Sequence, residues 1–149
     1  MQRSITYKNY LAPLYAAFYI IYSSIGTIYP FLPPLLALLF VLYSRAMKEG
    51  DSLVLLLIVV CLIVFEANYG YLLFSSIIYF YILYKFIIPK VTQNILCVSC
   101  LNIAYVLLTY IGYFLFLTLI AHIFLLQPPE INFYILYYMV IDFFLVSLL

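Results

Sequence analysis

The sequence predicts an all-α polytopic membrane protein, folded as one helical bundle of about six transmembrane helices. Seventy per cent of its 149 residues are hydrophobic and only 7% are charged. A soluble domain has roughly 25% charged residues, so this chain cannot cover a water-exposed surface. The apolar runs are continuous and do not alternate over strands of about ten residues, which favours helices over a barrel. We therefore expect a single integral membrane domain over residues 1–149.

Turn-forming residues divide the chain into six apolar segments. The break YPFLPP carries three prolines, which interrupt the helical hydrogen-bond ladder. Later breaks are the polar loop SRAMKEGDS, the turn EANYG, the basic loop IIPKVTQN and the Pro-Pro turn QPPE. We expect the fifth segment to be tilted, to be kinked at Gly112, or to begin as a surface helix after Pro89. The expected spans are about 10–29, 31–44, 53–66, 70–87, 99–125 and 131–149.

The placement of charge supports six spans independently. A six-span chain puts all its cations on one side of the membrane and leaves Glu66 and Glu130 on the other. By the positive-inside rule, this arrangement predicts cytoplasmic N- and C-termini. A five-span chain, with 31–44 re-entrant, would put cations on both sides. The cations are Arg3, Lys8, Arg45, Lys48, Lys85 and Lys90.

The turn EANYG raises the question of what a carboxylate does between two apolar segments. Glu66 ends the third expected span on the outer side, and Gly70 can take the positive φ that closes a turn. One interpretation is a polar loop tip whose charge stays near water. The other is a carboxylate directed toward a partner or into the bundle, because acids at membrane depth are costly to desolvate and are candidates for function.

This part of the chain resembles the MreD family of rod-shape-determining membrane proteins. The resemblance rests on a proline-containing break after the first span, a short second span, a basic loop, and a third span ending in an acid followed by glycine. In that family the turn usually carries Asp, where this chain has Glu66 before Gly70. Residue matches lie within 29–74. The resemblance implies a non-enzymatic bundle in the bacterial inner membrane, related to the substrate-binding subunits of vitamin transporters. It implies MreC, MreB, RodA and a penicillin-binding transpeptidase as partners.

Two further polar residues are candidates for partner binding. Asp142 lies within YMVIDFFLV, about twelve residues after the outer turn, which at about 1.5 Å per residue puts it near mid-membrane. We expect it to be protonated, paired, or hydrogen-bonded to Asn102 or to tyrosine hydroxyls, with a partner-facing or transport role as alternatives. The single histidine, His122, falls near the outer end of the fifth span. We expect an interhelical or interfacial hydrogen bond there, with proton relay or ligand contact as the alternative.

No motif predicts catalysis, a cofactor or a resident metal. Cys97 and Cys100 have redox or zinc spacing, but no second pair or nearby histidine completes four ligands. We therefore expect a scaffold that binds the lipid bilayer and other membrane proteins, and no nucleic acid. The alternative is a small substrate-binding subunit of a transporter, or an accessory subunit of another membrane complex. A transporter is expected to show repeats or paired broken helices, and only one Pro break is present.

Overall fold

The computed structural model describes residues 2–128, 130 and 133–148, with side chains from Tyr10 onward. The regular elements of this part of the chain are all helical, which confirms the all-α class. Two of the six continuous helices are each built from three elements, because a π-helical turn (η) interrupts the α-helix. The elements are α1 Gln2–Ile28, α2 Leu36–Glu49, α3 Ser52–Tyr69, α4 Ser75–Ile82, η1 Leu83–Ile87, α5 Ile88–Asn94, α6 Val98–Leu107, η2 Leu108–Gly112, α7 Tyr113–Phe124 and α8 Tyr134–Leu148.

Three of these helices are long and apolar enough to cross a membrane: Tyr10–Ile28, Ser52–Tyr69 and the continuous Val98–Phe124. The shorter apolar helix α8 also belongs to the bundle. These lengths and compositions are those of a membrane protein, and the count of six crossings stays a prediction. The expected sixth span began at 131, but residues 131–132 and 149 lie outside the described part of the chain.

Two segments expected to be loops are helical. Residues 44–49 continue α2, and the turn that follows contains only Gly50 and Asp51 before α3 begins. Gly50 closes the helix at φ 73°, and its N–H donates to the Ala46 carbonyl. The polar residues of this segment include good helix formers, so polarity ends the apolar stretch without ending the helix. Residues 88–94 likewise form α5, which continues the helix from η1, and Pro89 lies directly after this π-helical turn.

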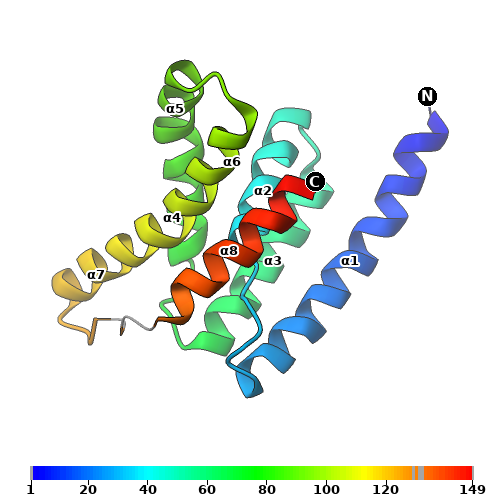
Figure 1. Cartoon of the computed structure of the whole chain (residues 1–149). Coiled ribbons are helices and arrows are strands. Elements are labelled where there is room, and N and C mark those ends of the chain that lie inside the picture. Colours follow the sequence, from blue (N-terminus) through cyan, green and yellow to red (C-terminus); the bar gives the residue numbers. More distant parts are fainter. Residues whose placement is uncertain (1, 129, 131–132, 149) are drawn as a thin grey trace.

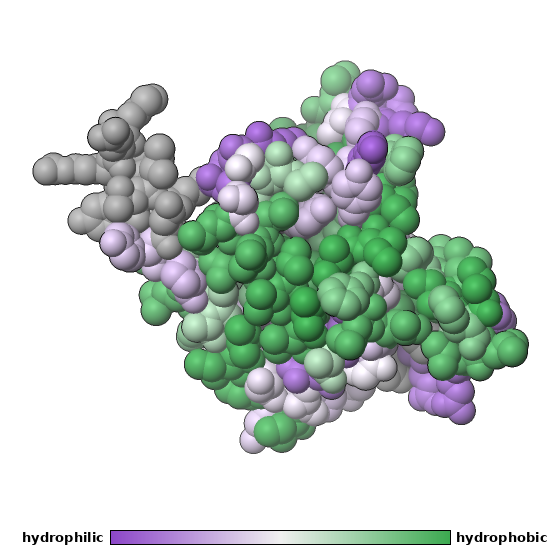
Figure 2. All heavy atoms as spheres, turned by 180° about the vertical axis from the view of Figure 1, so that it is seen from behind, coloured by the Kyte–Doolittle hydropathy of each residue, from purple (hydrophilic) through white to green (hydrophobic). Residues whose placement is uncertain are grey.

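The bundle is organised around α2. This helix packs against α3, α6, η2 and α8, whereas α1 packs chiefly against α3. Figure 1 shows α1 at one edge of the molecule, with its N-terminal half standing away from the other helices. The interior is filled by fully buried apolar side chains, including an edge-to-face pair between Phe40 and Phe80 with ring centroids 5.1 Å apart. Figure 2 shows hydrophobic side chains across the middle of one face and hydrophilic ones toward its upper and lower ends.

Successive helices run in alternating directions, so both ends of the chain lie at the same end of the bundle (Figure 1). The start of α1, the end of α2 and α5 also lie there. We call this the basic end, because Arg45 and Lys48 close α2 while Lys85 and Lys90 lie in η1 and α5. The opposite end is formed by the ends of α1, α3 and α7 and the start of α8. The fold therefore gathers these cations at one end of the bundle, and the side of the membrane that this end faces stays a prediction.

The π-helical turn η2 lies where a kink was expected. It ends at Gly112, and the Tyr79 hydroxyl of α4 donates to the Leu108 carbonyl over 2.6 Å. A Cβ placed on Gly112 would lie 1.9 Å from this hydroxyl oxygen. Gly112 therefore allows the tyrosine side chain to pass close to the backbone, and the π-helical turn frees a carbonyl that the tyrosine satisfies.

Candidate functional site

The helices α2 and α4 both begin without a capping side chain of their own. Their N-cap residues, Leu35 and Phe74, have φ values of 54° and 68° and form no side-chain cap hydrogen bond. The left-handed conformation costs an L-residue about 1–2 kcal/mol. The first backbone N–H groups of any helix also lack intrahelical acceptors. Both helix starts therefore need acceptors from elsewhere in the chain.

Glu66 supplies the acceptors for α4. One carboxylate oxygen accepts from the Phe74 N–H at 2.7 Å. The other accepts from the Ser76 N–H at 2.6 Å and from the Ser75 hydroxyl at 3.1 Å. The carboxylate thus lies at the positive end of the helix dipole, where negative charge is stabilised. Hydroxyl groups extend this network, because the Ser76 hydroxyl donates to the Tyr113 hydroxyl of α7 at 2.9 Å.

Of the two interpretations of Glu66, the loop tip near water is wrong, because Glu66 is 0% exposed. The carboxylate is directed into the bundle, as the other interpretation allowed. The helix α3 continues beyond Glu66 to Tyr69, so this acid lies in the last helical turn and points inward. Gly70 is exposed and has φ 70°, as expected, and its N–H donates to the Glu66 carbonyl. The buried Glu66 carboxylate therefore fixes the turn between α3 and α4 by hydrogen bonds, and Gly70 lies on the exposed side of the same turn.

Asp142 supplies the acceptor for α2. Its Oδ2 atom accepts from the Ala37 N–H at 3.0 Å and from the Tyr110 hydroxyl at 2.7 Å. The side chain is 0% exposed, which confirms the expected hydrogen bonding inside the bundle, through a tyrosine hydroxyl. Its Oδ1 atom has no hydrogen-bond partner among the described residues. One carboxyl group therefore joins α8 to α2 and η2.

His122 lies apart from both acids. It is exposed in the last turn of α7, and the described part of the chain offers it no hydrogen-bond partner. An interhelical hydrogen bond of His122 is therefore absent among the described residues, and the interfacial alternative stays a prediction. Cys97 and Cys100 are also exposed, at the start of α6, and a hydrogen bond from Cys100 lowers the pKa of the Cys97 thiol. No group of three or more metal-binding side chains occurs among the described residues.

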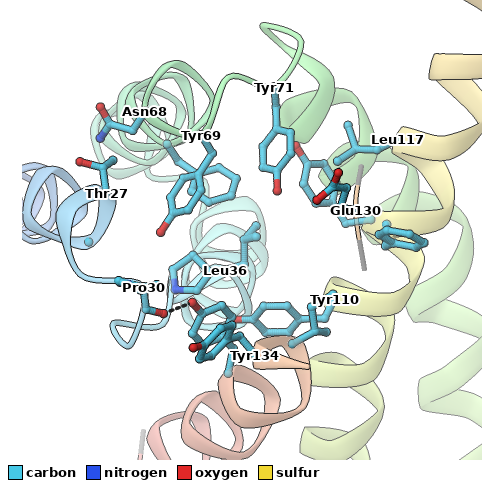
Figure 3. Close-up of a pocket in the computed structure, with 17 residues that line it drawn as sticks. Thr27, Pro30, Leu36, Asn68, Tyr69, Tyr71, Tyr110, Leu117, Glu130 and Tyr134 are labelled. Atoms are coloured by element: carbon cyan, nitrogen blue, oxygen red, sulfur yellow. Dashed lines mark hydrogen bonds between the residues drawn. The ribbon is translucent and has the colours of Figure 1, made fainter. Parts of the chain in front are cut away.

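A pocket of about 430 Å³ opens between α1, α3, α7 and α8, at the end opposite the basic end. Figure 3 shows side chains from these elements facing a common space, with Tyr69 and Tyr71 on one side and Tyr110 and Tyr134 on another. Glu130 lines the same space. We call this space the tyrosine pocket, after its lining residues Tyr69, Tyr71, Tyr110, Tyr113, Tyr134 and Tyr138.

The loop between α1 and α2 forms part of this pocket and is held by tyrosines. Tyr19 donates to the Pro34 carbonyl and Tyr22 to the Pro33 carbonyl, each over 2.9 Å. Tyr138 of α8 donates to the Pro30 carbonyl from the opposite side. The prolines that break the helix thus leave carbonyls that tyrosine hydroxyls satisfy, and the loop is fixed against the bundle.

The tyrosine pocket was not predicted from the sequence. Tyrosines cluster at 69–84 and again at 134–138, but clustering at helix ends is also what membrane interfaces favour. The signal that distinguishes them is tertiary: Tyr69 and Tyr134 come from different helix ends that meet at one end of the bundle.

Comparison with protein-family models, curated proteins and solved structures finds no match to this chain.

Proposed function

We propose that this chain is a non-enzymatic membrane scaffold, similar to MreD, that binds other membrane proteins of the peptidoglycan elongation machinery. Short turns and helix faces make up most of the described chain, so a partner must dock on those surfaces. The observation that carries the proposal is the position of α1. This helix packs chiefly against α3, and Leu14 and Phe18 are 64% and 71% exposed on it.

Membrane helices associate by close packing and polar contacts. The face of α1 that does not pack against α3 can therefore bind a helix of a partner protein. The proposed partners are an MreC-like protein with one span, a RodA-like protein and a penicillin-binding transpeptidase, in the bacterial inner membrane. In this proposal Glu66 acts by fixing the turn after α3, and exposed Gly70 gives that turn its shape. Asp142 holds α8 in place, and exposed His122 offers a further polar contact.

The experiment is co-purification of an MreC-like partner with the double variant Leu14→Ala/Phe18→Ala. We expect partner recovery to fall severalfold, because both side chains lie on one face of α1, four residues apart. The matched control is Val140→Ala/Phe144→Ala on α8, where the spacing is the same and the side chains are 55% and 62% exposed. Equal recovery for both double variants would contradict the proposed use of α1.

A second candidate is a small substrate-binding subunit of a transporter, and the tyrosine pocket favours it. A pocket of about 430 Å³ falls within the usual size of small-molecule sites, roughly 300–1,000 Å³. The two candidates predict different partners. A transporter subunit should co-purify with an energising ATPase, whereas a scaffold should co-purify with a single-span protein that carries a coiled coil outside the membrane.

A further inference from the structure

The tyrosine pocket has two aromatic walls. Tyr69 and Tyr71, from the end of α3 and the turn after it, are stacked with ring centroids 6.1 Å apart and planes at 10°. Tyr134 and Tyr138, one helical turn apart on α8, form a second stack at 6.3 Å and 23°. Figure 3 shows space between these groups of rings. Ring faces carry partial negative charge, so two such walls form an environment that suits a cation.

The charges around the pocket have one sign. Glu130 is the only charged side chain among the lining residues that the structure describes. Asp142 lies directly behind the lining, where its Oδ2 atom accepts from the hydroxyl of the lining residue Tyr110. The described lysines and arginines belong to the opposite, basic end. The field in the pocket therefore favours positive ligands and opposes anions.

The polar groups of the pocket do not suit a bare metal ion. Ca²⁺ takes six to eight oxygen ligands and prefers several carboxylates. Among the described lining residues, only Glu130 carries a carboxylate, which is too few for such an ion. A larger cation with an apolar surface fits both features, because the rings contact its alkyl groups while a single carboxylate balances its charge.

We propose that the tyrosine pocket binds an organic cation with a quaternary ammonium group, held between the tyrosine faces with Glu130 as its counter-ion. Aromatic ring faces that surround a quaternary ammonium group bind it through cation–π attraction, and a nearby carboxylate balances its charge. This proposal names the ligand class of the pocket that favours the second candidate function. Binding of the cation requires neither a scaffold partner nor a transport partner, so it can be tested separately from co-purification. The ligand can be a free cation or the headgroup of a lipid, because both present the same ammonium group.

The test is calorimetric titration of the full chain with choline in nanodiscs of phosphatidylethanolamine and phosphatidylglycerol. The neutral comparison is 3,3-dimethylbutan-1-ol, which replaces the charged nitrogen of choline with carbon. We expect choline to bind at least about tenfold more tightly than this alcohol, since desolvated cation–π pairs and a counter-ion act only on the charged ligand. Nanodiscs that also contain phosphatidylcholine identify the source: weaker choline binding in them indicates a lipid headgroup, and unchanged binding indicates a free cation.

Two variants locate the site, each with a matched control. Glu130→Gln should weaken choline binding about tenfold, whereas Glu49→Gln at the basic end should leave it unchanged. Tyr134→Leu should weaken it similarly, while Tyr10→Leu, at an α1 position that is 77% exposed and outside the lining, should not. Equal binding of choline and the alcohol, no choline binding by the folded wild-type protein, or equal loss in variants and controls would overturn the proposal.

Discussion

At the scale of single residues, Glu66 and Asp142 do what a serine or aspartate at the N-cap usually does, but neither acid occupies the N-cap position of the helix that it caps. Asp142 caps a helix start 105 residues before it. Each acid thereby satisfies backbone donors that cannot reach water. Because a buried donor without an acceptor costs about 1–3 kcal/mol, both acids should stabilise the fold substantially.

Glu66→Ala should lower the free energy of unfolding by about 3 kcal/mol or more, because three donors lose a charged acceptor at once. Glu66→Gln should cost less, since its remaining oxygen still accepts. Thermal unfolding in detergent, followed by helical circular dichroism, measures both. Glu130→Gln is the control, since Glu130 is exposed. A Glu66→Ala protein as stable as this control would show that the cap is not needed.

Asp142→Leu should destabilise the protein by about 0.6–2 kcal/mol, the range for polar contacts between membrane helices. Asp142→Asn should retain most of the stability, because an amide oxygen can still accept from Ala37 and Tyr110. A double-mutant cycle of Asp142→Leu with Tyr110→Phe separates the pair energy. Strictly additive losses in this cycle would exclude an energetic role for the hydrogen bond between them.

At the scale of elements, η2 and α4 depend on each other through one close approach. Gly112→Ala places a methyl group 1.9 Å from the Tyr79 hydroxyl oxygen. Overpacking of this kind costs about 1–3 kcal/mol, so the unfolding midpoint should fall. Adding Tyr79→Phe removes the clashing oxygen and should restore part of the loss. If Gly112→Ala has no effect, or the second change brings no recovery, this contact does not limit the packing of the two helices.

At the scale of the whole molecule, the alternating helices predict that the two ends of the bundle face opposite sides of the membrane. Single cysteines placed by Ala67→Cys or Gln127→Cys should react with an impermeant maleimide from outside intact cells, and Lys48→Cys only after lysis. The background must lack Cys61, Cys97 and Cys100, since the last two are exposed at the start of α6. Labelling of Ala67→Cys or Gln127→Cys only after lysis would contradict the six-crossing arrangement.

The apolar composition and the breaks between apolar segments predicted most of the helices, and the ends of some helices were predicted wrongly. The prolines at 30–34 and the glycines at 50 and 70 mark real helix ends, because their backbone preferences act locally. The polar residues at 44–49 led to a predicted end of the second helix that is too early, because a helix can leave the apolar region without ending. Asp142 was correctly placed in the bundle since its apolar flanks leave no other environment.

The amino-acid sequence alone determined the membrane class, the six helices and the gathering of cations at one end. These follow from the apolar content and from backbone preferences that act within a few residues. Only the tertiary structure decided that Glu66 turns inward to cap α4, and that tyrosines from four elements meet around Glu130. Both depend on which helix ends become neighbours. The Glu66 cap depends on how the turn between the consecutive helices α3 and α4 brings the start of α4 back to this acid. The pocket depends on packing between segments far apart in the chain, which no local pattern encodes.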